Sequence, residues 1–526
     1  MGKHLRVKVV LIREGAWRAW QRAIVERMLD VDGVTLVAVF AIGTLPPQPE
    51  REVPHGVPHY SLAVESRGDG TCMVDEPVAT LLRSLGAEAI VNLSSACIVA
   101  PASCSEGALW LTHRGIAAMR ELCAGSDVCE VALLRGDASG RHAILRSGAF
   151  ATRGYTVAAS AADIYRATQE WLIEALRALA RGESLVAEPT EFARWRGSDR
   201  VAPRTSYRMR RAAHFIASKF RRYFRHEIWN VGVADRPIDS VAVAGRSGEA
   251  IRGVRWLPKL ARGRFLADPF AIERDGALEI ACEDYDYRSD KGVIAMIRLN
   301  GGLQIQTVLD EPFHLSYPFL VRDGGTTYAI PESHQARAVM LYEVPPFPQR
   351  WKRVATLIDG IAALDSSVVW YRDRWWLWCS DADRGSNHTL LLYWARDLRG
   401  PYVAHPRNPV KIDVRSARPG GTPFVTDGVL YRPAQDCSKT YGGRVVLNRV
   451  TALSEHEYAE EVVSAVGPDA AAYPDGLHTL AQVGSRVVVD GKRFMFAPSG
   501  FVRALRQRVS LPERASETAA SSNGRR

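Results

Sequence analysis

The sequence lacks the features that would place it across a membrane or in an oxidising compartment. It has no run of 18 apolar residues, so we expect no helix that spans a bilayer. Residues 1–6 contain no apolar core of a signal peptide. The eight cysteines include no CxxC pair and have no regular spacing, which argues against a disulfide framework and a structural metal site. We therefore expect a cytoplasmic protein, peripheral on a membrane at most.

A dinucleotide-binding motif is also missing. The first apolar run, at residues 7–12, is followed by the sequence Arg13-Glu14-Gly15-Ala16 and not by GxGxxG. The composition is that of a globular protein, with 47% hydrophobic and 24% charged residues, and 526 residues suffice for two to four domains.

Strands and helices alternate over residues 5–185. Apolar strands are predicted at 7–12, 34–40 and 89–93, and amphipathic helices at 17–29 and 78–85. Alternation of this kind predicts a parallel sheet with helices on both faces, and therefore an α/β domain.

A repeated sequence phrase, or motif, of two short β runs around a turn occurs in five copies in the second half of the chain. The copies begin at residues 268, 317, 365, 422 and 478, and the last copy has its expected turn at Asp490-Gly491. A further apolar run follows the first hairpin in most copies. A repeat of this length with several strands predicts a β-propeller of five blades, an all-β fold.

The two halves are joined by a basic segment. Residues 203–226 hold eight lysines and arginines without an acidic residue, and apolar side chains recur there at helical spacing. Such a helix either packs its apolar stripe on a domain or lies on an anionic membrane surface. No nucleic-acid-binding motif accompanies it.

These patterns divide the chain into four parts. We predict an α/β domain at 1–190, a basic helical linker at 191–227, the propeller at 228–505 and a disordered tail at 506–526.

The first domain resembles the formyltransferase fold, a family that includes methionyl-tRNA formyltransferase and sugar N-formyltransferases. The resemblance is carried by the string at 107–115, which contains His113, and by the loop around Asp137. It implies a catalytic role for His113 and Asp137, and 10-formyltetrahydrofolate as the cofactor. The family's Asn, two residues before the histidine, is replaced here by Leu111. Since the amide supplies part of the electrostatic stabilisation, we expect a domain that has lost formyl transfer.

The chemistry of the propeller is expected at the repeated positions. Asp268, Tyr317, Asp365, Thr422 and His478 begin the copies, and acids close the second strand of most copies. Acids with aromatic side chains nearby suit sugar hydroxyls and sugar faces. Together with polar residues of the string at 432–442, the predicted substrate-binding set is Glu283, Asp284, Tyr317, Asp381, Arg418, Arg432, Gln435, Asp436, Tyr441 and His478.

The propeller resembles two families. The motifs Asp268-Pro269-Phe270 and Asp365-Ser366 are similar to those of five-bladed glycoside hydrolases. A more specific resemblance, over most of 229–496 and strongest in the string at 432–442, is to the propeller half of plant glucosamine inositolphosphorylceramide transferase. The resemblance implies a carbohydrate or glycolipid substrate.

Two classes of function remain open at this point. As an enzyme, the protein would transfer or cleave a sugar, with Asp268 as base or nucleophile, Glu332 as acid and Asp365 as a modulator of pKa. As a non-catalytic platform, the propeller would only bind a glycan. N-formylation of an amino sugar is a third alternative.

Overall fold

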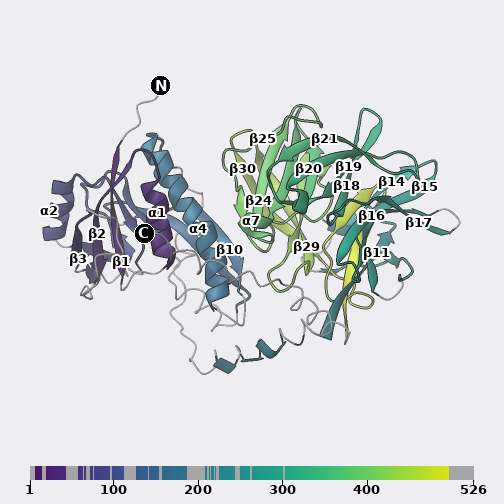
Figure 1. Ribbon diagram of the computed structural model, residues 1–526, viewed down its shortest axis with the longest axis horizontal. Helices are drawn as coiled ribbons and strands as arrows, with labels where there is room; N and C mark the ends of the chain where they lie inside the picture. The colour runs from purple at the N-terminus through teal and green to yellow at the C-terminus, as the bar shows by residue number, and fades with distance from the viewer. Residues whose placement is uncertain are drawn as a thin grey trace, which may run out of the picture.

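The computed structural model describes most of both halves of the chain (Figure 1). The described residues are 6–14, 19–42, 57–62, 64–66, 71–74, 76–94, 97–111, 126–139, 141–152, 157–185, 208–209, 212–213, 215–217, 220, 224–242, 249–260, 263–299 and 302–496. None of the helices in these ranges is both long and apolar enough to cross a membrane.

A seven-stranded sheet forms the centre of the N-terminal domain. Its strands lie in the order β10-β9-β8-β6-β1-β2-β3, of which the last five are parallel and β9 and β10 antiparallel. The bounds are β1 (Val7–Glu14), β2 (Val34–Ile42), β3 (His59–Leu62), β6 (Ala89–Asn92), β8 (Gly107–Leu111), β9 (Val128–Gly136) and β10 (His142–Ala151). A small sheet of β4 (Val64–Ser66), β5 (Thr71–Val74) and β7 (Cys97–Val99) accompanies it.

Helices pack on the central sheet through two separate apolar clusters. The helices α1 (Ala19–Leu29) and α4 (Val157–Ala180) contribute to one cluster, which includes Met28 and Leu172. The helix α2 (Glu76–Leu85) contributes Leu82 to another. Figure 1 shows α1 and α4 side by side along the sheet. The sheet and its helices agree with the predicted alternation, whereas the likeness to formyltransferases stays a prediction.

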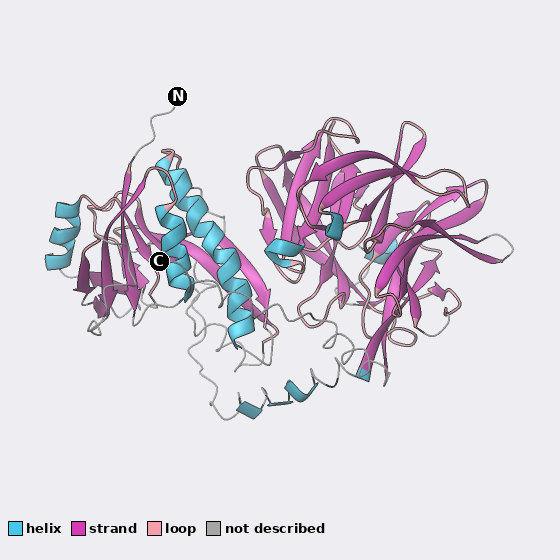
Figure 2. Cartoon of the chain, in the orientation of Figure 1, coloured by secondary structure: helices cyan, strands magenta, loops and turns pink. Residues whose placement is uncertain are grey.

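Five sheets make the propeller, which is almost entirely β structure in Figure 2. Three blades are built from consecutive strands. The first blade consists of β14 (Arg264–Arg274), β15 (Ala277–Asp286), β16 (Lys291–Leu299) and β17 (Leu303–Leu309), and the second of β18 (Ser316–Asp323), β19 (Thr326–Glu332), β20 (Ala338–Glu343) and β21 (Lys352–Asp359). The third consists of β22 (Ala363–Trp370), β23 (Trp375–Asp381), β24 (Thr389–Ala395) and β25 (Val403–Ala404), with β26 (Lys411–Ile412) beside β24. Short helical turns η3 (His334–Ala336) and α7 (Ala382–Gly385) follow β19 and β23.

The fourth and fifth blades join distant parts of the chain. The fourth contains β27 (Phe424–Thr426), β28 (Val429–Asp436), β29 (Arg444–Leu453), β30 (Tyr458–Gly467) and, parallel to β30, β12 (Glu249–Ala250). The fifth contains β31 (Leu480–Val483), β32 (Arg486–Phe496), β11 (Arg225–Ala234) and β13 (Arg255–Trp256), near the short helix α6 (Ile238–Ala242). Because β11 pairs along ten residues with β32, the first strand of the propeller closes the ring against its last.

The turn of the fifth repeat does not lie where the sequence pattern predicts it. The hairpin turns at Gly484, which has a φ of +55°, and Asp490 lies within β32. Asp490 is fully buried, and its carboxylate accepts hydrogen bonds from the backbone amides of His478, Thr479 and Asp268. The Asp490-Gly491 pair of this repeat therefore lies inside the propeller and does not form a turn.

The start of the repeated phrase has a special backbone conformation in the first three copies. Asp268, Tyr317 and Asp365 have φ values of +53°, +42° and +52°, and the pairing register of their strands shifts at this point. Positive φ is uncommon for residues with a side chain, because the Cβ atom crowds the backbone. The repeat thus encodes a bulge that turns these side chains out of the regular alternation of the strand.

Few residues of the basic segment are described. Met209, Ile216 and Phe220 are exposed there. Phe220 also stacks on Phe496, with ring centroids 6.3 Å apart. Contact of residues 203–226 with an anionic membrane surface stays a prediction, and the predicted tail at 506–526 lies outside the described residues.

Candidate functional site

Four carboxyl groups from three blades lie near one another inside the propeller. Asp268 lies on β14, Glu283 on β15, Glu332 at the end of β19 and Asp365 on β22. They are only 2% to 6% exposed, and the charge of each of the other three acts on Glu283. We call these four residues the carboxylate cluster. The predicted catalytic acids Asp268, Glu332 and Asp365 are all members of it.

Arg418 is the principal cation of the cluster. Its Nε and Nη2 donate to the two oxygens of Asp365, at 2.6 and 3.2 Å, and Nη2 lies 3.7 Å from Oε2 of Glu332. Gln435 donates a further hydrogen bond of 2.6 Å to Asp365. Two of the predicted binding residues, Arg418 and Gln435, thus fix the orientation of one carboxyl group.

Asp268 belongs to a second group of charges. Nε2 of His478 lies 3.3 Å from Oδ1 of Asp268, and Nδ1 lies 2.5 Å from Oδ2 of Asp490. The hydroxyl of Thr479 also donates to Asp268 at 3.1 Å. Against the cost of burial, Asp490 and Asp268 raise the pKa of His478, so the imidazole carries a charge between two carboxylates.

Three ligand atoms in this group lie within 4.8 Å of one another and could hold a cation. They belong to Asp268, His478 and Asp490, and all three residues are buried. Both carboxylates already face the charged imidazole, and Asp490 also accepts backbone amides. A metal would require the imidazole to lose its proton, so the residues fit a charged hydrogen-bond cluster better than a metal site.

The four carboxyl groups differ in how readily they ionise. Burial raises the pKa of Glu283 well above its usual range, and the charges of Asp268 and Glu332 raise it further. Burial also raises the pKa of Asp365 to about 8, although Arg418 opposes this. Against the same cost, a hydrogen bond from His334 and the charge of Arg418 lower the pKa of Glu332 to about 2. Glu332 is therefore ionised, while Glu283 keeps its proton.

This pattern differs from the roles expected from the sequence, which stay predictions. Glu332 was expected to be the acid, yet Nδ1 of His334 lies 2.9 Å from its Oε1 and holds it as a carboxylate. Glu283 was expected only to bind substrate. Its Oε1 has the imidazole of His314 at 3.5 Å, and burial lowers the pKa of that imidazole. Among the described residues no lysine or arginine forms an ion pair with Glu283, and burial holds the pKa of its carboxyl group high.

Aromatic side chains border the cluster. The guanidinium of Arg418 lies 5.0 Å from the ring centroid of Tyr441, and the hydroxyl of Tyr441 is 3.5 Å from Nη2. Trp229 stacks on His478 with centroids 3.9 Å apart. The hydroxyl of Tyr317 donates to or accepts from that of Ser367 at 2.9 Å. The predicted residues Tyr317, Tyr441 and His478 therefore lie beside the carboxylates, and Trp229 joins them.

Four residues predicted to bind substrate have structural partners instead. Asp284 pairs with Arg264, Asp381 caps α7 by accepting from the amide of Asp383, and Asp436 accepts from Ser438 and Arg444. Arg432 is fully buried and pairs with Glu460 at 2.6 Å, away from the cluster. Thr422, the fourth repeat start, donates its backbone amide to Leu480.

The predicted formyltransferase residues are not seen to form a site. His113 lies outside the described residues. Asp137 is exposed, and its Oδ1 accepts from the amides of Ser139 and Arg141 and from the hydroxyl of Ser139. The hydrogen bond from Ser139 lowers the pKa of Asp137. Asp137 therefore caps a tight turn between β9 and β10.

Sequence reasoning missed several members of the site, among them Asp490 and His334. Asp490 was taken as a turn residue because it precedes a glycine, and His334 stands outside the repeated phrase. A usable signal for Asp490 existed, since the strand pattern Arg486–Phe496 continues through it without a break. No local pattern points to His334, whose role depends on the return of the chain after β19.

Part of the propeller matches one known protein family. Residues 259–470 match the family described as "Glucosamine inositolphosphorylceramide transferase 1, N-terminal". The protein of that name from Oryza sativa subsp. japonica is 36% identical over 209 residues, which cover 38% of this chain and 28% of the rice protein. The Arabidopsis thaliana protein is 32% identical over 205 residues, covering 37% and 27%. The match thus spans under a third of these relatives.

Among solved structures, glycoside hydrolases are similar. A thermostable family-43 glycoside hydrolase has a TM-score of 0.30 at 13% identity, covering 38% of this chain and 75% of that one. A family 117 glycoside hydrolase of Zobellia galactanivorans has a TM-score of 0.33 at 12% identity, covering 52% and 91%. Both superpositions are loose, and the assignment of the propeller rests on its five sheets.

Proposed function

We propose that the propeller is an enzyme that makes or breaks a glycosidic bond in a glycoconjugate, at the carboxylate cluster. One observation carries the proposal: four buried carboxyl groups lie together, and burial raises the pKa of Glu283 while His334 and Arg418 lower that of Glu332. Glycosidic-bond chemistry needs this combination, because one carboxylic acid protonates the leaving oxygen while a carboxylate stabilises or attacks the sugar carbon. Separation of pKa values between neighbouring acids is how a protein assigns these roles at neutral pH.

In this proposal each side chain has a separate task. Glu283 donates the proton, and Asp268 acts as the base or nucleophile. Glu332 stabilises positive charge that develops on the sugar ring. Arg418 and Gln435 hold the carboxyl group of Asp365 in a fixed orientation. Tyr441 offers an aromatic ring on whose face a sugar can stack.

The relatives suggest the kind of substrate. Their name, glucosamine inositolphosphorylceramide transferase, joins a sugar, glucosamine, to a lipid, inositolphosphorylceramide. The matched stretch contains Asp268, Glu283, Glu332, Asp365 and Arg418. We therefore expect the sugar of a glycolipid or polysaccharide as substrate, with the lipid or polymer remaining outside the buried cluster.

A glycan-binding platform is the second candidate, and one feature favours it. Several of these carboxylates also hold the bulges of the repeat. Asp490 accepts from the amide of Asp268, Asp268 from that of Tyr317, and Glu332 from that of Asp365, at 3.1 to 3.3 Å. Such carboxylates stabilise the ring of blades whether or not a substrate is turned over.

The decisive experiment separates turnover from binding. The full chain is assayed with p-nitrophenyl glycosides of glucosamine, galactose, xylose and arabinose, and the same sugars are titrated calorimetrically. On the enzyme proposal, Glu283→Gln lowers kcat by about 10²–10⁴-fold and leaves sugar binding within a few-fold, since the amide keeps the shape and loses the proton. Asp284→Asn, one residue along the same strand, is the matched control and leaves kcat unchanged. Sugar binding without turnover in the unmodified protein identifies the platform.

We infer that the N-terminal domain no longer transfers formyl groups. Leu111 stands where the resembling family has its amide. Asp137 cannot take a proton readily, because its Oδ1 accepts three hydrogen bonds within its own turn. Binding of 10-formyltetrahydrofolate, and N-formylation of an amino sugar, are therefore not expected.

A further inference from the structure

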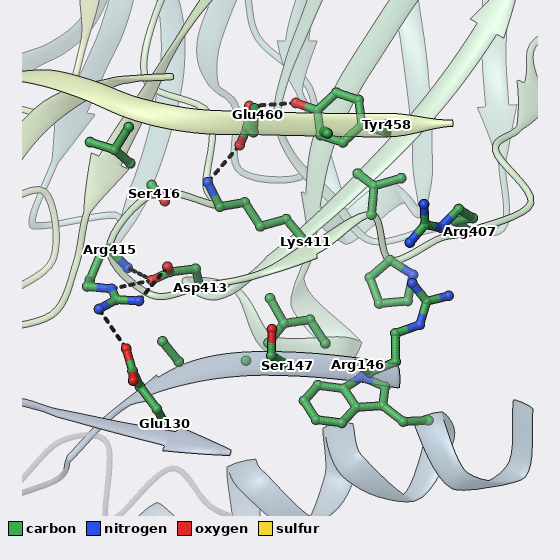
Figure 3. Close-up of a pocket in the computed structure, with 18 of the residues that line it drawn as sticks. Glu130, Arg146, Ser147, Arg407, Lys411, Asp413, Arg415, Ser416, Tyr458 and Glu460 are labelled. Carbon is green, nitrogen blue, oxygen red and sulfur yellow. Dashed lines mark hydrogen bonds and ion pairs between the residues drawn. The ribbon is translucent and has the colours of Figure 1, made fainter. Parts of the chain in front are cut away.

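A polar cavity lies between the two domains (Figure 3). It has a volume of about 490 Å³, within the range of about 300–1,000 Å³ that small-molecule sites occupy. One wall is formed by β10 and α4 of the N-terminal domain, and the other by residues 407–416 and β30 of the propeller. No member of the carboxylate cluster lines it, so it is a separate site.

The two walls are joined by direct contacts. The side chain of Ile412 packs in the apolar core of the N-terminal domain, next to Trp171. The backbone amide of Val414 donates to the carbonyl of Ala149, at 2.9 Å. Gly148 allows this approach, since a Cβ there would lie 2.9 Å from Trp171 and 3.0 Å from Ile412. The cavity is thus enclosed by an interlocked interface.

Most charges in the cavity are already neutralised by neighbours. Lys411 donates to Glu460 at 2.8 Å, and Tyr458 donates to the same carboxylate. Arg415 bridges Asp413 and Glu130, both at 2.8 to 2.9 Å, and so links the two domains. These pairs leave little net charge for a ligand to meet.

Arg407 is different, because it has no acidic partner among the described residues. Arg407 is half-buried. Burial of the nearby His405, together with the charge of Arg407, lowers the pKa of His405 to about 4. Figure 3 shows Arg146, from β10, at the same end of the cavity as Arg407. Arg146 also interacts electrostatically with Glu174 of α4, a carboxyl group whose pKa is raised by burial. Glu457, the remaining acid of the lining, is exposed. Two guanidinium groups from opposite domains therefore converge on one end of the space.

A buried hydroxyl marks another part of the lining. Ser416 is completely buried, and its Oγ has no hydrogen-bond partner among the described residues. An unsatisfied buried hydroxyl is rare in folded proteins, because it loses its hydrogen bonds to water without replacement. A ligand with hydroxyl or phosphate oxygens would supply the missing partner.

We propose that this cavity binds a small phosphate monoester of a polyol, such as a sugar phosphate. The phosphate dianion lies between Arg146 and Arg407, whose planar guanidinium groups suit two oxygens each. The polyol fills the rest of the space, which is too large for phosphate alone, and a hydroxyl of the ligand bonds to Ser416. Its binding fastens the two domains together.

One short segment of the chain connects the cavity to the carboxylate cluster inside the propeller. Residues 412–418 run from the interface, where Ile412 is anchored, to Arg418 in the carboxylate cluster. The amides of Ser416 and Ala417 donate to the carbonyl of Asp413, so this short segment is internally bonded. A ligand that holds the segment also holds the guanidinium that orients Asp365.

The test is calorimetric titration of the full chain with named probes. Glucose 6-phosphate, ribose 5-phosphate and myo-inositol 1-phosphate are compared with glucose and inorganic phosphate at fixed salt. At least one monoester binds one-to-one, at least about tenfold more tightly than inorganic phosphate, and glucose does not bind. Arg407→Gln and Arg146→Gln each weaken this binding by about tenfold to a hundredfold, the range for a lost charged hydrogen bond. Arg350→Gln removes the same charge from an exposed part of the propeller and has no effect.

Further variants distinguish this site from the carboxylate cluster. Ser416→Ala weakens monoester binding by several-fold while the unfolding midpoint stays unchanged, because the hydroxyl makes no bond in the free protein. Glu283→Gln leaves monoester binding intact even where it abolishes turnover. The proposal fails if none of the three monoesters binds the folded protein, if inorganic phosphate binds equally well, or if neither arginine variant weakens binding.

Discussion

Two buried ionic groups in the propeller show how the same fold treats charge in opposite ways. Around Arg432, each charge has a partner: Glu460 accepts from Arg432, Lys411 and Tyr458. Against the cost of burial, Arg432 and Lys411 lower the pKa of Glu460 to about 2. In the carboxylate cluster the acids outnumber the cations, and burial raises the pKa of Asp268, Glu283 and Asp365.

The comparison shows which buried ionic group stabilises the fold and which one costs free energy of folding. A balanced buried group resists loss of a partner, because the survivor would remain as an uncompensated charge. An excess of buried acid costs free energy at neutral pH, and groups of this kind collect at sites that do chemistry. The group around Arg432 is therefore structural, although its arginine was predicted from the sequence to bind substrate.

The largest effect on stability is expected from the balanced group. Glu460→Gln leaves Arg432 and Lys411 buried without their anion and lowers the free energy of unfolding by about 3–5 kcal/mol. Glu461→Gln, on the next residue of the same strand, breaks an exposed pair with Arg449 and costs about 0–1 kcal/mol. Urea denaturation at pH 7 measures both. Equal losses in the two variants would remove the distinction between the buried and exposed pairs.

A smaller effect separates two acids within the carboxylate cluster. Glu332→Gln replaces an ionised group that accepts from His334 and faces Arg418, and we expect a loss of about 1.5–3 kcal/mol. Glu283→Gln replaces a group that already carries a proton, so the free energy of unfolding changes by less than about 1 kcal/mol or rises. The same urea experiment compares them. Destabilisation by Glu283→Gln as large as that by Glu332→Gln would mean that Glu283 is ionised.

The pH dependence of stability offers a third comparison. The folded pKa values of Glu332 and Glu460 lie near 2, below their usual 4.5, so their contribution is complete above pH 4.5 and is lost as the pH falls toward 2. Asp365 acts in the opposite sense, since its raised pKa of about 8 makes ionisation increasingly costly as the pH rises from 4 to 8. Urea midpoints between pH 2 and 8 should therefore fall toward both the acid and the alkaline end of this range. Glu332→Gln should make the acid fall shallower; an unchanged slope would contradict its lowered pKa.

The smallest effect is expected in the N-terminal domain, where Asp137, the described residue of the predicted site, is bonded within its own turn. Titration with 10-formyltetrahydrofolate should give no heat of binding. Leu111→Asn should restore neither binding nor turnover, because Asp137 remains bound within its turn. Formyl transfer by this variant at ordinary enzymatic rates would show that Asp137 leaves its turn when substrate is present.

Much of the fold was accessible from the sequence because it depends on local pattern. The repeated starts at Asp268, Tyr317 and Asp365 correspond to equivalent bulges in three blades, with the same positive φ. The fifth copy was harder to interpret. Its third strand, β11, comes from the beginning of the propeller, so no window of sequence contains the whole blade.

The candidate site was only partly accessible. Repeat position correctly placed Asp268 and Asp365 in the interior, but it also selected Asp284 and Asp436, which pair with arginines at the end of their strands. Neighbouring residues of a strand point to opposite faces, so adjacent acids such as Glu283 and Asp284 meet different surroundings. Composition alone does not distinguish them.

The sequence by itself determined the five-bladed ring and the places where its strands bulge, because strand alternation, turns and repeats act over a few residues. Only the tertiary structure decided which acid keeps its proton. That depends on the distances from Glu283 and Glu332 to Arg418 and His334, and on exclusion of water, which arise when separate blades meet. The position of Arg146 and Arg407 at the same end of one cavity was decided in the same way, since the two residues are far apart in the sequence and lie on different domains.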